Sequence, residues 1–161
     1  MITPSNILIC GCFDLLHSGH ILLLEGASRF GNVYVGIGDD ESIRDSKGES
    51  RPILPQSERL QMIQACRYVT RARIFHFKED KWENYEELIK WSTPIAYAQG
   101  PDHAPEVLSA MLEVKGIPVI VIPNKIQGTT DIEKKIFQTF IKSQPTTEAP
   151  FQDEDYYFNT K

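Results

Sequence analysis

Two histidines near the start of the chain carry the strongest chemical signal in the sequence. His17 and His20 stand at the end of the ten-residue segment GCFDLLHSGH, which spans residues 11–20. Their spacing places both imidazoles on one face of a helix's first turn, where free backbone N–H groups and the positive end of the helix dipole also lie. This arrangement suits a phosphate group, because imidazoles can donate hydrogen bonds to negative charge that develops on it. A purely structural alternative is that one histidine caps the helix and the other packs against its neighbours.

The residues around this segment predict a strand that leads into it and a helix that leaves it. Residues 6–10 read NILIC, a run typical of a buried strand, and the following Gly11 lets a ligand approach the backbone because it has no Cβ. Residues 17–30 have apolar side chains at helical spacing, and Gly31 stands where a C-terminal cap belongs. The sequence therefore predicts that the histidines lie at a turn between a strand and a helix.

The same alternation continues along the chain and predicts an α/β fold. Further strands are expected at residues 32–37, 73–77, 95–98 and 117–122, and further helices at residues 57–69, 82–91, 104–115 and 130–141. Residues 38–55 are expected to form a polar loop. Five strands that alternate with helices predict one doubly wound, five-stranded parallel sheet, and such sheets bind ligands at the carboxyl ends of their strands.

Composition limits the classes of partner. The chain has 161 residues, 41% of them apolar, and a net charge of −5, which argues against nucleic acid as the main partner. The apolar runs are too short to span a bilayer, and the first residues lack the features of a secretory signal. The three cysteines, like the two histidines above, lack metal-ligand spacing, so no metal site made by the protein is expected. We expect a cytoplasmic protein with one domain over residues 1–142, a flexible acidic tail over residues 143–161, and no membrane partner.

The segment at residues 11–20 resembles the GxFDxxHxGH signature of the cytidylyltransferase-like nucleotidyltransferases. This family includes glycerol-3-phosphate cytidylyltransferase and the heptose-1-phosphate adenylyltransferase domain, and the resemblance extends over about residues 6–141. The letters KG at residues 47–48, RPI at 51–53 and ER at 58–59 are similar to a stretch of the adenylyltransferases. The segments GPDHAPE at residues 100–106 and GTTDI at 128–132 are similar to two more of their motifs. The resemblance implies the Rossmann-like HxGH nucleotidyltransferase fold.

The resemblance also implies which residues form the site. The catalytic residues would be His17, His20 and Lys47, and the nucleotide would contact Gly11, Cys12, Phe13, Asp14, Gly19, Asp102, Lys125, Gln127, Gly128, Thr129 and Thr130. Arg51 and Arg59 would contact the acceptor or a phosphate. The residues themselves leave other roles open. Lys47 on its polar loop would suit a triphosphate or simply be solvated, the two threonines would cap a helix, Asp102 would be an ordinary turn residue, and Arg59 would pair with acids on its own helix.

Several positions depart from the family's pattern. His103 stands in place of a tyrosine, Gln99 in place of a lysine, Gly128 in place of a serine and Thr70 in place of an aspartate. The loop over residues 123–127 is short and lacks the family's arginine, for which Lys125 would substitute. These departures leave the nucleobase and the acceptor open.

The expected reaction joins the nucleoside monophosphate of ATP or CTP to a phosphorylated small molecule and releases pyrophosphate, with Mg²⁺ bound to the triphosphate. A sugar-phosphate adenylyltransferase is favoured, and a glycerol-3-phosphate-type cytidylyltransferase is the alternative. The resemblance further implies a homodimer. Two other classes stay open: a nucleotide-binding regulator without catalysis, and an NAD-binding oxidoreductase. The second lacks the GxGxxG turn after the first strand, because Phe13 stands where its second glycine belongs.

Overall fold

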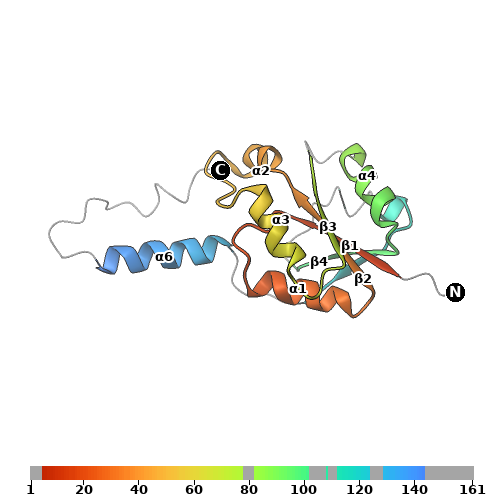
Figure 1. Cartoon of the computed structure of the whole chain (residues 1–161), viewed down its shortest axis with the longest axis horizontal. Helices are drawn as coiled ribbons and strands as arrows, with labels where there is room; N and C mark the ends of the chain where they lie inside the picture. Colours follow the sequence, from red (N-terminus) through yellow and green to blue (C-terminus); the bar gives the residue numbers. More distant parts are fainter. Residues whose placement is uncertain (1–4, 78–81, 102–107, 109–111, 124–128, 144–161) are drawn as a thin grey trace.

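Five parallel strands form one sheet in the computed structural model, which describes residues 5–77, 82–101, 108, 112–123 and 129–143 (Figure 1). The strands are β1 (Asn6–Gly11), β2 (Asn32–Gly38), β3 (Arg71–Phe75), β4 (Ala96–Gln99) and β5 (Val119–Val121). Their order across the sheet is β3-β2-β1-β4-β5, and every neighbouring pair is parallel. The direction of the strand order reverses between β1 and β4, so the predicted ligand edge lies where β1 ends.

Helices cover both faces of this sheet, which confirms the doubly wound architecture. The helices are α1 (Ser18–Ser28), α2 (Asp40–Lys47), α3 (Gln56–Gln64), α4 (Trp82–Ser92) and α6 (Thr129–Ser143). Helices α1 and α3 pack on one face, and α4 packs on the other, whereas α6 leads away from the sheet (Figure 1). None of the described helices is both long and apolar enough to cross a membrane.

The core is divided by the sheet into two clusters. Ile7 and Ile9 of β1 point to the face that α1 and α3 cover, and Leu8 points to the face that α4 covers. All three side chains are buried, because a parallel sheet with helices on both faces has no solvent-facing side. Burial of each such side chain stabilises the fold by roughly 1.5–3 kcal/mol. The continuous apolar run that predicted β1 therefore reflects burial on both faces.

Three predicted segments differ from the structure. The polar loop expected over residues 38–55 contains helix α2, which Asp39 caps by accepting a hydrogen bond from the backbone N–H of Ser42 at 2.8 Å. The helix expected over residues 57–69 ends at Gln64, and β3 begins at Arg71 rather than at residue 73. Most of the helix expected over residues 104–115, and the tail over residues 144–161, lie outside the described residues.

Candidate active site

His17 and His20 meet at the turn between β1 and α1, as the sequence predicted. His17 is the N-cap of α1, where its Nδ1 accepts a hydrogen bond from the backbone N–H of Gly19 at 3.2 Å. The Nδ1 of His20 accepts one from the backbone N–H of His17 at 3.4 Å. The two rings stack, with their centroids 3.8 Å apart. Because a nitrogen that accepts carries no proton, both neutral imidazoles hold their proton on Nε2.

This tautomer reconciles the structural and the chemical roles of the histidines. Capping uses Nδ1 of His17, and the contact between the two residues uses Nδ1 of His20. Neither contact uses Nε2, so both Nε2–H groups remain hydrogen-bond donors. The structural alternative is correct in that His17 caps α1, but capping leaves the donor chemistry of the ring intact.

The surroundings keep both imidazoles neutral. Burial and, to a smaller extent, the interactions with His17 and Lys47 together lower the pKa of His20 to about 3, against a raising effect of Asp14. Burial also lowers the pKa of His17 below its ordinary value. The pair consequently acts near neutral pH as two hydrogen-bond donors without a positive charge of their own.

Lys47 supplies the positive charge that the histidines lack. It is the last residue of α2, its side chain is exposed, and it lies close enough to His20 for its charge to lower the pKa of that ring. Gly48 follows with φ 97°, a left-handed conformation that favours glycine and ends the helix there. The loop position expected for Lys47 is therefore wrong, because the residue sits on a short helix that brings it to the histidines.

The Phe13 ring lies next to both Gly11 and His20. The Phe13 ring is buried with its centroid 5.1 Å from that of His20, and a Cβ on Gly11 would come within 3.0 Å of Phe13 Cε2. A side chain at position 11 would therefore press against this ring. The Phe13 side chain is buried in the core, and its expected contact with a nucleotide stays a prediction. The backbone N–H of Gly19 is used by the cap on His17.

Asp14 holds the chain between α2 and α3 against the histidine loop. Its Oδ1 accepts a hydrogen bond from the backbone N–H of Leu54 at 3.0 Å, and its Oδ2 accepts one from that of Ile53 at 2.9 Å. Arg51 adds an ion pair to Oδ2 at 3.2 Å. The carboxylate is thus turned towards the protein, and these contacts give Asp14 a positioning role, while its contact with a nucleotide stays a prediction.

Arg59 is turned into the protein and has a structural role, so its expected contact with the acceptor or a phosphate stays a prediction. Its side chain is completely buried on α3. Nη1 donates to the carbonyl of Cys12 at 2.5 Å, and Nη2 donates to the carbonyl of Gly38 at 2.9 Å and to Oδ1 of Asp40 at 2.6 Å. Nε donates to the carbonyl of Leu54 at 3.0 Å. The guanidinium therefore joins the ends of β1 and β2 to the starts of α2 and α3, and its acid partner lies on α2 rather than on its own helix.

Arg51 connects the histidine loop to the last helix. Its guanidinium pairs with Asp14 at one nitrogen and with Glu133 of α6 at the other. Thr129 and Thr130 open α6, as predicted. The other residues expected in this part of the site, Asp102, Lys125, Gln127 and Gly128, lie outside the described residues, as does His103.

Sequence reasoning missed the acids that hold the start of α2. Asp39 caps that helix and contacts His76, which follows β3, and Asp40 pairs with Arg59. Two adjacent aspartates directly after a strand are a signal for a helix N-terminus, because an N-cap carboxylate accepts from free N–H groups. That signal could have revealed α2, whereas nothing in the sequence marks the partners.

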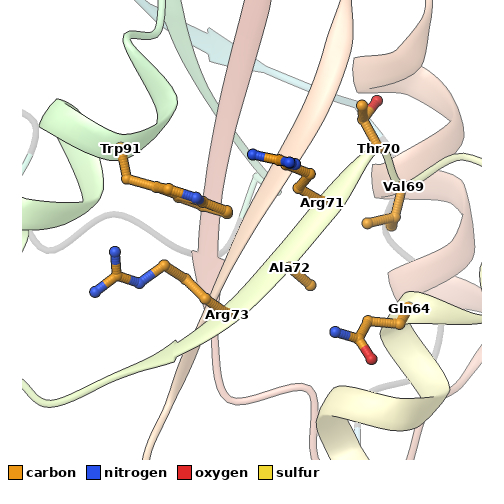
Figure 2. A pocket seen from close by; sticks show the side chains of 7 residues that line it. All are labelled: Gln64, Val69, Thr70, Arg71, Ala72, Arg73 and Trp91. Carbon is orange, nitrogen blue, oxygen red and sulfur yellow. The ribbon is translucent and has the colours of Figure 1, made fainter.

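A separate hollow lies at the edge of the sheet, away from these residues. It has a volume of about 440 Å³ and lies along β3 (Figure 2). It is lined by Gln64, Val69, Thr70, Arg71, Ala72, Arg73 and Trp91. Arg73 lies over the Trp91 ring at 5.5 Å and pairs with exposed Glu87 at 3.3 Å. None of the predicted site residues lines this hollow.

The chain is similar to known proteins in its sequence and in its fold. The model of the family described as cytidylyltransferase-like matches residues 8–145. The bifunctional protein HldE of Desulfatibacillum aliphaticivorans is 36% identical over 73% of the chain, and that of Koribacter versatilis is 39% identical over 77% of it. These matches cover 24% and 26% of the two relatives, so the chain spans about a quarter of their length.

Two solved structures share the fold. A lipopolysaccharide core biosynthesis protein from Thermoplasma volcanium has a TM-score of 0.63 at 24% identity, with 77% of this chain and 100% of that chain covered. A pantoate-beta-alanine ligase from Francisella tularensis has a TM-score of 0.57 at 14% identity, with 90% and 74% covered. At these identities the likeness concerns the fold alone.

Proposed function

The chain belongs to the cytidylyltransferase-like family, and on that premise we propose that it transfers the nucleoside monophosphate of a nucleoside triphosphate to a small phosphorylated acceptor. The observation that carries the proposal is the stacked pair of neutral imidazoles at the end of β1, with both Nε2–H groups left as donors. Lys47, whose charge lowers the pKa of His20, is the third residue of the proposed catalytic group.

The proposed reaction is an in-line displacement at the α-phosphorus. A phosphate oxygen of the acceptor forms a new P–O bond as the bond to the bridging oxygen breaks, and pyrophosphate leaves with that bond's electron pair. His17 and His20 would donate to the oxygens on which negative charge builds, and Lys47 would hold the triphosphate or the acceptor phosphate. No proton has to be taken from the enzyme and no covalent intermediate is required.

We propose Mg²⁺ as the counter-ion of the triphosphate. Within the described part of the chain, no three His, Cys, Asp or Glu side chains lie together in a way that could hold a metal. The metal would be bound by the phosphates of the nucleotide, and it would neutralise charge on the departing pyrophosphate.

We propose a sugar phosphate as the acceptor and ATP as the donor. The motifs at residues 47–59, 100–106 and 128–132 support this choice, because they resemble those of the adenylyltransferases. Similarity to the bifunctional HldE proteins supports it too. A polyol-phosphate cytidylyltransferase is the second candidate, because the segment at residues 11–20 fits both activities equally well.

A pyrophosphate-release assay tests the activity and the choice of substrates together. ATP, CTP, GTP and UTP are each combined with a panel of sugar 1-phosphates and polyol phosphates in the presence of Mg²⁺. We expect release with ATP and a sugar phosphate, and release with CTP and glycerol 3-phosphate would favour the second candidate. Nucleotide binding without release for any acceptor would contradict the proposal and favour a regulator without catalysis.

We further propose that the enzyme is a homodimer that acts in the cytoplasm. The resemblance to the family supports the first statement, and the three free cysteines, which are typical of a reducing compartment, support the second. Light scattering after size-exclusion chromatography tests the mass, and cell fractionation tests the compartment.

A further inference from the structure

A second histidine–carboxylate cluster lies beside the candidate site, at the carboxyl ends of β2 and β3. Oδ2 of Asp39 lies 2.8 Å from Nδ1 of His76, the residue that follows β3. Oδ1 of the same carboxylate accepts from the backbone N–H of Ser42 at 2.8 Å. The buried Ser42 hydroxyl accepts from the backbone N–H of Phe77 at 2.9 Å and lies 3.3 Å from the histidine's Nδ1. These contacts tie the start of α2 to the segment after β3.

The direction of the histidine hydrogen bond follows from the charge of its partner. Burial raises the pKa of Asp39, but the hydrogen bonds from Ser42 and His76 outweigh it, so the pKa of this carboxyl lies below its ordinary value. An ionised carboxylate only accepts hydrogen bonds. The Nδ1 of His76 is therefore the donor, and its half-exposed ring turns the other nitrogen away from the carboxylate.

Helix α2 links this cluster to the stacked histidines. Asp39 caps the start of the helix. Asp40, its first residue, exchanges hydrogen bonds with Gln56 and pairs with Arg59. Its last residue is Lys47, whose charge acts on His20. Eight residues at 1.5 Å each make α2 about 12 Å long, enough to pass over two strand spacings of about 4.8 Å. A shift at the start of so short a helix is carried to its last residue.

We propose that His76 is a positioning residue, which fixes the start of α2 through Asp39 and thereby fixes the place of Lys47 beside His20. The catalytic consequence rests on the proposed nucleotidyl transfer. Nothing in this role requires His76 to touch a substrate, so its effect depends on Nδ1 alone and passes entirely through Lys47.

Three substitutions at one position separate this role from a direct contact. His76→Asn keeps a donor near the place of Nδ1, His76→Gln keeps one near the place of Nε2, and His76→Ala keeps neither. We expect His76→Ala and His76→Gln to lower kcat/KM about tenfold, the effect of losing one hydrogen bond to a charged group. We expect His76→Asn to restore most of the activity. The matched control is Glu87→Ala, which removes an exposed ion pair to the same strand and should leave kcat/KM unchanged.

A double-mutant cycle with Lys47→Ala tests the route of the effect. If His76 acts through Lys47, His76→Ala adds nothing to the loss in the Lys47→Ala protein. Independent losses that multiply would overturn the proposal, and so would wild-type activity of His76→Ala. Rescue by His76→Gln and not by His76→Asn would also overturn it, because the ring would then meet the acceptor directly.

Hydrogen exchange of the α2 amides gives a readout without any substrate. We expect faster exchange at Ser42 and Ile43 in His76→Ala and His76→Gln, and wild-type exchange in His76→Asn. Unchanged exchange in all three variants would overturn the anchoring of α2. If the wild-type protein releases no pyrophosphate while exchange follows the expected pattern, the proposed function fails and the anchoring stands.

Discussion

His17 joins two roles in one ring, and a single substitution separates them. Asparagine is a good N-cap and keeps an acceptor for the N–H of Gly19, but it has no group at the place of Nε2. We predict that His17→Asn unfolds at nearly the wild-type urea concentration and loses about 10²–10³-fold in turnover, as expected for one lost donor to a transition state. Urea denaturation and the pyrophosphate assay measure the two effects. Turnover close to wild type would remove the catalytic role of His17.

The low pKa of His20 makes stability depend on pH. The ring titrates at about 3 in the folded chain, against an ordinary value of 6.5, so the unfolded chain binds more protons between these values. The stability that the neutral His20 ring contributes is fully present above pH 6.5, and it is lost as the pH falls from 6.5 towards 3. We predict that the wild-type protein loses up to about 2 kcal/mol more than His20→Gln between pH 7 and pH 5. Urea titrations at the two pH values measure the difference, and equal losses would contradict it.

Arg59 holds several elements together, because its buried guanidinium joins the ends of β1 and β2 to the starts of α2 and α3. Replacing it by methionine leaves the carbonyls of Cys12 and Gly38 without this donor and leaves Asp40 without its cation. We predict that Arg59→Met lowers the free energy of unfolding by about 3–5 kcal/mol, measured by urea denaturation. The control is Arg29→Ala on α1, an exposed pair expected to cost less than about 0.5 kcal/mol. If the Arg59→Met protein is well folded and only its KM for the acceptor rises, Arg59 contacts the acceptor, as the sequence predicted.

Elements whose residues show a pattern along the chain could be predicted, and those fixed by distant partners could not. β1 and α1 were correct because an apolar run leads into a glycine and a periodic segment follows. Helix α2 was missed because its only large buried apolar side chain is Ile43, and a single residue gives no periodicity. The role of Arg59 was missed because two of its acceptors, at Cys12 and Gly38, lie 47 and 21 residues away.

At the scale of the whole molecule, the sheet order places the histidines beside the reversal between β1 and β4. The sequence predicted parallel strands and the edge at which ligands bind, since alternation with helices implies both. The sequence did not predict the strand order β3-β2-β1-β4-β5, because the pairing between β1 and β4 joins segments some 90 residues apart. Residues 102–107 and 124–128, which hold four of the predicted contacts, are not among the described residues.

The proposed nucleotide would bind to three parts of the molecule at once. Its phosphates would meet the β1–α1 turn, the end of α2 and the start of α6, and α6 already reaches this region through the pair between Arg51 and Glu133. A ligand that binds only the folded chain stabilises it by about 2.7 kcal/mol at 100 times its Kd. For a chain of this size that corresponds to a rise in Tm of about 5 to 10 °C.

We predict this rise for ATP with Mg²⁺, a smaller one for CTP, and little for AMP at the same concentration and ionic strength, because AMP lacks the phosphates that would reach Lys47 and α6. Thermal denaturation followed by circular dichroism measures the three shifts. The Lys47→Ala protein serves as the comparison, since it should lose much of the response to ATP and keep the small response to AMP. Equal shifts for ATP and AMP would mean that the outer phosphates make no contact with the folded chain. That result would contradict the proposal that Lys47 binds the triphosphate.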